Sequence, residues 1–183
     1  MGDDLLRRQL AEIFAADQAG SEREPENAPI AAGLPREVTL RPLSFDMVEA
    51  FLDDHELRHL RDVDGEFVVR FTGGDHRLGA IEIGMDIQGS DGSVLDLRAS
   101  FDARLGRKQF GPALILCNNW NRRFRIPKAT FLSEDDIGII VLRQSIMFSL
   151  GTFPEQVADD LDFFFSMTQD FYEWALEEER GVF

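Results

Sequence analysis

Apolar and polar residues alternate through the middle of the chain, a pattern typical of strands that bury one face. From Ile81 to Ile87, for example, every second residue is apolar. Turn sequences at Asp64-Gly65 and Ser90–Gly92 separate the alternating runs and favour antiparallel connections. Four strands are predicted in this region, at residues 60–63, 67–71, 78–87 and 94–101.

Two short segments on either side of these strands show the helical spacing of apolar residues. Ser44 can cap the first, which ends near Asp53 and Asp54. Pro112 suits the first position of the second, which covers residues 113–120. We therefore expect one helix before the four strands and one after them.

The longest helical segment runs from Phe153 to about Glu178, after a capping box formed by Thr152 and Glu155. Its apolar residues occupy more than one face, whereas a helix that covers a sheet needs a stripe of only about 100°. The extra surface requires a second neighbour: another helix of this chain, a second subunit or a bound peptide. The residues predicted to form an interaction surface are Phe163, Phe164, Met167, Phe171 and Trp174.

Two further strands are predicted at residues 126–132 and 137–144, on either side of an acidic turn at residues 133–136. The order of elements is then α-β-β-β-β-α-β-β-α. This order is typical of an α+β fold in which helices flank an antiparallel sheet.

The N-terminal part of the chain differs in composition from the rest. Residues 1–19 carry leucine, isoleucine and phenylalanine at helical spacing and predict an amphipathic helix. Residues 20–36 contain three prolines and alternating charges, which predicts a linker before a main domain at 37–183. The apolar stripe of the N-terminal helix is expected to pack on the domain, on a second copy or on a partner.

The segment Cys117–Ala129 ends a helix and starts a strand within a dozen residues. Asn121 is predicted to stop the helix, because asparagine tolerates left-handed backbone conformations and competes for helical hydrogen bonds. Arg122 and Arg123 then lie beside the negative end of the helix dipole. Pro127 biases the preceding Ile126 toward extended geometry, which favours a strand.

This segment resembles the YbjN-type family of bacterial proteins, which are described as sensory-transduction regulators. Trp120-Asn121 and Pro127-Lys128-Ala129 carry the resemblance most specifically, and it extends over roughly Ser44 to Leu176. The resemblance implies a fold like that of type III secretion chaperones. It also implies a regulatory or chaperone-like function and a bacterial source.

The composition disfavours several other classes of function. The chain has 19 basic and 34 acidic residues, a net charge of -15 that repels nucleic acid and anionic membranes. The one dense basic cluster, at residues 122–128, is too small to track phosphates. We find no apolar run of membrane-spanning length and no pattern typical of a signal peptide. The single cysteine, Cys117, excludes an intramolecular disulfide, so we expect a cytoplasmic protein.

One motif nevertheless matches a catalytic signature. His55-Glu56-Leu57-Arg58-His59 has the H-E-x-x-H pattern of zinc metalloproteases, in which both histidines lie one turn apart on a continuous helix. Here a predicted hairpin begins directly after the second histidine, and Arg58 places a cation between the two ligands. Surface or helix-end histidines are therefore the preferred interpretation, and a zinc-dependent hydrolase is the alternative.

We therefore expect a non-enzymatic module that binds a protein or peptide, or a second copy of itself. No catalytic residue, metal ligand or cofactor site is predicted. The acidic surface favours basic partners. Metal analysis of protein purified without added zinc would distinguish this hypothesis from the hydrolase.

Overall fold

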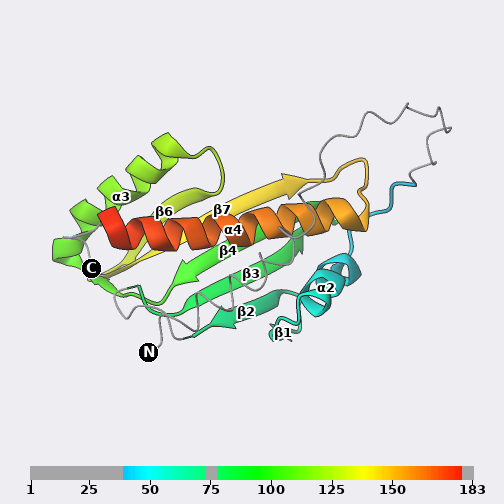
Figure 1. Cartoon of the computed structure of the whole chain (residues 1–183), viewed down its shortest axis with the longest axis horizontal. Helices are drawn as coiled ribbons and strands as arrows, with labels where there is room; N and C mark the ends of the chain where they lie inside the picture. Colours follow the sequence, from blue (N-terminus) through cyan, green and yellow to red (C-terminus); the bar gives the residue numbers. More distant parts are fainter. Residues whose placement is uncertain (1–38, 73–77, 179–183) are drawn as a thin grey trace, which may run out of the picture.

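One antiparallel sheet with helices on one of its faces makes up the part of the chain that the structure describes, residues 39–72 and 78–178 (Figure 1). The structure is a computed structural model. The strands are β1 (His59–Arg61), β2 (Phe67–Phe71), β3 (Ile81–Gln88), β4 (Val94–Phe101), β5 (Leu105–Gly106), β6 (Lys128–Glu134) and β7 (Ile137–Met147). The described helices are α2 (Phe45–Asp54), α3 (Phe110–Arg123) and α4 (Pro154–Glu178). The predicted N-terminal helix and linker, residues 1–19 and 20–36, lie outside the described residues.

The predicted fold class and order of elements are confirmed. The sheet order is β1-β2-β3-β4-β7-β5, and β6 pairs with β7 on its other side. All pairings are antiparallel. The two-residue strand β5 was not predicted, because it is too short to produce an alternating pattern.

The Asp64-Gly65 hairpin forms as predicted. Gly65 adopts φ +98°, a left-handed conformation that glycine takes without steric cost. The Asp62 carboxylate accepts hydrogen bonds from the backbone amides of Asp64 and Glu66, both at 2.9 Å. The turn therefore fixes the register between β1 and β2.

Alternation along the strands divides the sheet into a helix-covered face and an open face. In β2, Phe67, Val69 and Phe71 are buried, while Arg70 between them is exposed. Strands β3, β4 and β7 bury alternate residues on the same side. Helix α4 crosses this side of the sheet, with α2 near β1 and β2 and α3 near β6 (Figure 1).

Aromatic side chains connect the helices to the sheet. Phe165 of α4 lies between Phe51 of α2, at 5.7 Å between ring centroids, and Phe71 of β2, at 6.2 Å. Near the other end of α4, Phe171 lies 5.2 Å from Phe101 and 5.0 Å from Trp120. All three described helices therefore share one core with the sheet. None of these helices combines the length and apolar content that a membrane crossing requires.

Three predicted helix ends are wrong. Helix α3 begins at Phe110, so Pro112 lies at its third position and not at its first. Helix α3 continues past Asn121 to Arg123, because the Asn121 side chain bonds to β6 and leaves the helix backbone undisturbed. Helix α4 begins at Pro154 rather than Phe153, so Thr152 lies one residue before the cap position. Instead of forming a capping box, Thr152 is buried and exchanges backbone hydrogen bonds with Arg41, at 2.7 and 2.8 Å.

Two predicted strands begin later than expected. β3 starts at Ile81 rather than residue 78, although Leu78 is buried. β6 starts at Lys128 rather than Ile126, because the chain bends at residues 125–127. At this bend the Trp120 indole donates a hydrogen bond to the Pro127 carbonyl at 3.0 Å.

Candidate functional site

The aromatic residues of α4 do not form the single exposed surface that the sequence suggested. Phe164 and Phe171 are fully buried, and Met167 is only 9% exposed. Trp174 is half-buried, with its ring 5.4 Å from that of Trp120. Phe163 alone is exposed, at 41%. The stripe is therefore covered by the sheet, α2 and α3. Of these, only α2, the helix after Ser44, was a predicted neighbour; the other candidate, the N-terminal helix, lies outside the described residues.

The H-E-x-x-H motif does not lie on a helix. Helix α2 ends at Asp54, Glu56 has a left-handed backbone with φ +52°, and His59 belongs to β1. Both ring nitrogens of His55 face acceptors: Nδ1 lies 2.9 Å from the Phe51 carbonyl and Nε2 lies 3.3 Å from Asp162.

The one-turn helical spacing that a zinc protease needs is therefore not formed. No group of three histidine, cysteine or acidic residues in the described ranges is arranged to hold a metal ion. The zinc-hydrolase alternative thus loses its geometric basis.

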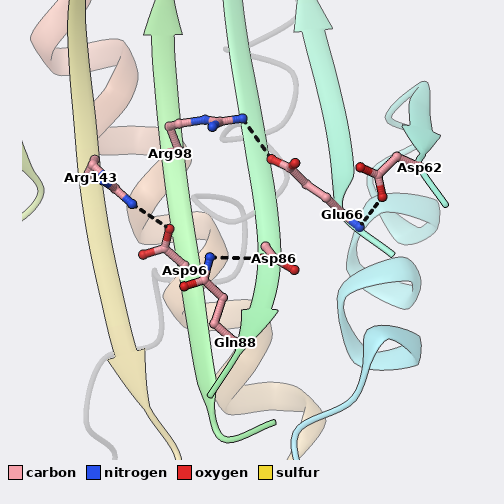
Figure 2. A network of polar contacts seen from close by, with 7 residues as sticks. All are labelled: Asp62, Glu66, Asp86, Gln88, Asp96, Arg98 and Arg143. Atoms are coloured by element: carbon pink, nitrogen blue, oxygen red, sulfur yellow. Dashed lines mark hydrogen bonds and ion pairs between the residues drawn. The ribbon is translucent and has the colours of Figure 1, made fainter. Parts of the chain in front are cut away.

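The open face of the sheet carries a network of charged side chains (Figure 2). In Figure 2 these side chains lie in front of the strands and α4 passes behind them. Arg98 pairs with Glu66 at 2.9 Å, and Arg143 pairs with Asp96 at 3.2 Å. Asp96 also accepts a 2.5 Å hydrogen bond from the Ser145 hydroxyl.

The carboxylates and cations of this network occupy adjacent rows across the strands. Asp86 and Asp96 are direct cross-strand partners. The next row along the strands places Arg98 opposite Arg143. Because the two like-charged rows lie side by side, Arg143 and Asp96 make a diagonal contact between neighbouring strands. The Arg98–Glu66 pair instead spans β3. Both arginines of the network are therefore paired with a carboxylate, while Asp86 remains outside these ion pairs.

A glycine makes room for one of these pairs. Gly84 of β3 lies between Glu66 and Arg98. A Cβ atom at residue 84 would lie 2.5 Å from Glu66 Oε1 and 3.2 Å from Arg98 Nη2. The missing side chain lets the ion pair cross over β3.

The second candidate surface is the outer edge of β6. The Asn121 side chain donates to the Ala129 carbonyl at 2.8 Å and accepts from the Ala129 amide at 2.9 Å. It therefore bonds to β6 as a neighbouring strand would. Lys128 donates to the carbonyls of Asn121 and Phe124, at 3.4 and 3.2 Å, and so interacts with the C-terminal end of α3.

Beyond Ala129, no other described strand pairs with this edge. A two-residue turn closes the β6–β7 hairpin with Glu134 opposite Ile137. The backbone groups of Glu134 therefore face β7, and those of Ala129, Phe131 and Ser133 face outward. Within the described residues, the outward groups of Phe131 and Ser133 have no hydrogen-bond partner.

Exposed apolar side chains accompany this edge. Leu132 of β6 is 47% exposed. Helix α3 packs its buried side against β6 and leaves Leu114 and Ile115 exposed on its other side, at 50% and 61%. The edge of β6 and the adjoining helix therefore offer backbone hydrogen bonds and apolar area together.

Neither surface could be predicted from the sequence, for two different reasons. The polar positions of β2, β3, β4 and β7 indicated an exposed face, but only the register shows which charges meet. The free edge depends on the position of β6 at the border of the sheet. No local sequence pattern indicates that a strand will lie at the border of a sheet.

The chain was compared with known proteins. Residues 44–177 match the family model YbjN, described as "Putative bacterial sensory transduction regulator". No curated protein matches the sequence.

The same fold is found in a solved structure. The crystal structure of YbjN from E. coli, described as "a putative transcription regulator", has a TM-score of 0.60 and 14% sequence identity. The match covers 77% of this chain and 96% of that one. An uncharacterized protein from Methanothermobacter thermautotrophicus has a TM-score of 0.44 and 14% identity, with 76% of this chain and 100% of that chain covered. On the family match over most of its length, this chain belongs to the YbjN family.

Proposed function

We propose that this protein is a non-enzymatic regulatory module of the cytoplasm that holds an extended segment of another protein along the edge of β6. One observation carries the proposal. The outward backbone groups of Phe131 and Ser133 have no hydrogen-bond partner within the described residues. A strand added at this edge gains main-chain hydrogen bonds, while neighbouring side chains provide selectivity.

The surroundings of the edge support the proposal. Leu132, Leu114 and Ile115 provide exposed apolar surface on β6 and α3. Asn121 already occupies the edge at Ala129, which limits an added strand to the end of β6 near the turn. The net charge of -15 favours a basic partner and weakens binding to nucleic acid and anionic membranes.

A second copy of the chain can use the same edge. In an antiparallel arrangement, Phe131 of one copy would face Ser133 of the other, and the reverse, giving two hydrogen-bonded pairs. Repulsion between two chains of charge -15 opposes this dimer. We therefore favour a separate, basic partner over self-association.

A proline at residue 133 tests whether the edge of β6 binds the partner. Ser133 is exposed and its amide does not bond to β7, so Ser133→Pro removes an edge donor without removing a sheet hydrogen bond. Ser133→Ala is the matched control, because it keeps the amide. The full chain and both variants are compared by light scattering and by affinity capture from a bacterial lysate.

We expect complexes with the unmodified chain and with Ser133→Ala, and their loss with Ser133→Pro. Thermal melting should confirm that the proline variant remains folded. A strict monomer that captures no partner would contradict the proposal, as would a partner retained by the folded proline variant.

A further inference from the structure

A small cavity lies on the open face of the sheet and reaches Ile139 of β7, the cross-strand partner of Leu132. Its volume is about 210 Å³, and its lining includes Arg70, Glu82, Ser100, Asp102, Arg104 and Ile139. Pockets for drug-sized ligands usually enclose about 300–1,000 Å³. The size therefore suits a ligand of only a few non-hydrogen atoms.

One side of the cavity is acidic and held in place by an arginine. Arg70 Nη1 lies 3.3 Å from Glu82 Oε2, and Arg70 Nη2 lies 3.0 Å from Asp102 Oδ2. The other oxygen of each carboxylate has no hydrogen bond within the described residues. Because Arg70 is shared between two carboxylates, the three groups together keep one negative charge and two free acceptor oxygens.

Donors lie beside these carboxylates in the same lining, because Ser100 is the cross-strand partner of Glu82. Arg104 is exposed and has no ion-pair partner in the part of the chain that the structure describes. The other arginines of this face, Arg70, Arg98 and Arg143, are each paired with a carboxylate. The Ser100 hydroxyl also has no hydrogen bond among the described residues. A guanidinium and a hydroxyl together are suited to bind a carboxylate.

We propose that this cavity binds a small zwitterion of the amino-acid type. The ligand carboxylate accepts from Arg104 and Ser100, and its ammonium group donates to the free oxygens of Glu82 and Asp102. Both charges of the ligand are then matched. An anion alone would face two carboxylates, and a cation alone would leave Arg104 unpaired.

This inference does not depend on the proposed protein-binding function, because the cavity and the β6 edge share no residue. The ligand of this cavity would be a small molecule that the proposed regulatory module senses. Failure of either proposal leaves the other untouched.

The test uses calorimetric titration of the full chain with L-alanine, L-aspartate and L-lysine, which share the zwitterionic head and differ in side-chain charge. Acetate and methylammonium serve as half-ligands. Each probe is added up to about 20 mM, a range that detects weak small-molecule binding. We expect at least one amino acid to bind, and both half-ligands to bind about tenfold or more weakly than it does.

Two cavity variants and one control locate the site. Arg104→Gln and Ser100→Ala should weaken binding, the former by about tenfold or more because it removes a charged donor. Arg58→Gln removes the same charge at an exposed position outside the cavity and should leave binding unchanged.

Three results would overturn the inference. One is no binding of any amino acid, and another is unchanged binding in Arg104→Gln. Acetate binding as tightly as the amino acids would also overturn it, because the ammonium contacts would then contribute nothing.

Discussion

Arg98 and Glu66 meet across an intervening strand, with Arg98 Nη2 2.9 Å from Glu66 Oε1, because residue 84 between them is glycine. The contact connects β4 to Glu66, the residue directly before β2, and leaves β3 in place. Such an exposed pair contributes about 0.2–1 kcal/mol. Its structural role is therefore to align the strands more than to stabilise the fold.

The first prediction concerns this glycine. Gly84→Ala should separate Glu66 from Arg98, since the new Cβ would lie 2.5 Å from the flexible end of Glu66. Alanine also reduces the entropy of the unfolded chain by about 0.4–1 kcal/mol, so the free energy of unfolding should change by less than about 1 kcal/mol. A double-mutant cycle should give coupling between Glu66 and Arg98 in the unmodified chain and none in Gly84→Ala. Equal coupling in both would contradict the role assigned to Gly84.

The second prediction concerns Asn121. Asn121→Ala should lower the free energy of unfolding by about 2 kcal/mol, because two hydrogen bonds to Ala129 are lost at about 1 kcal/mol each. Urea denaturation measures the change. Asn119→Ala, an exposed position on the same helix, should be neutral within about 0.5 kcal/mol. Equal effects of the two substitutions would show that the contacts to β6 do not contribute to the free energy of unfolding.

The third prediction concerns a buried polar group in β7. Gln144 is 7% exposed, and its Oε1 has no hydrogen-bond partner within the described residues. Gln144→Met keeps the shape and removes the unpaired oxygen, so stability should rise by about 1 kcal/mol. Thermal denaturation measures the gain, and Gln144→Glu should destabilise the protein strongly as the opposing control. A loss of stability in Gln144→Met would indicate that the oxygen is bonded.

The fourth prediction is a pH dependence that comes from α4. Burial raises the pKa of Asp160 above its ordinary value of 3.8, and Asp159 adds to the effect while a hydrogen bond from Gln156 opposes it. Partial burial also raises the pKa of Asp170, although its side chain remains exposed, and Glu173 adds to the effect. In the folded state these carboxyls therefore hold their protons more tightly than in the unfolded state. Their contribution to stability is complete below pH 3.8 and is lost as the pH rises through the folded pKa.

Asp170→Asn should therefore be more stable than the unmodified chain at pH 7, and the difference should disappear near pH 3. The gain should stay below about 1 kcal/mol, because the side chain is exposed and solvent screens it. Chemical denaturation at several pH values measures the difference. Glu155→Gln should have the opposite sign at pH 7, because Glu155 lies in the first turn of α4. The prediction fails if Asp170→Asn shows the same relative stability at both pH values.

The fold was largely predictable from the sequence because alternating residues in strands and helical spacing on α2 and α4 are local patterns. Two of the misplaced helix ends involve hydrogen bonds to a residue outside the helix. Asn121 has the character of a helix stop, yet its bonds to Ala129 use the side chain and leave α3 intact. Thr152 has the sequence of a cap, but pairing with Arg41 fixes it outside the helix.

The candidate surfaces were less predictable than the fold. The aromatic residues of α4 suggested a binding stripe, since a single helix gives no information about its neighbours. Phe171 is covered by Phe101 and Trp120, which are 70 and 51 residues away in the sequence. Which of the apolar residues is left exposed is therefore decided by tertiary packing.

The proximity of Trp120 and Trp174 gives the protein an intrinsic optical reporter. They are the two tryptophans of the chain, and their ring centroids lie 5.4 Å apart where α3 meets α4. Fluorescence excited in the indoles therefore originates from this one corner of the core. Separation of α3 from α4 should change the emission even when the sheet remains intact, so partial opening of the helical layer could be followed without a label.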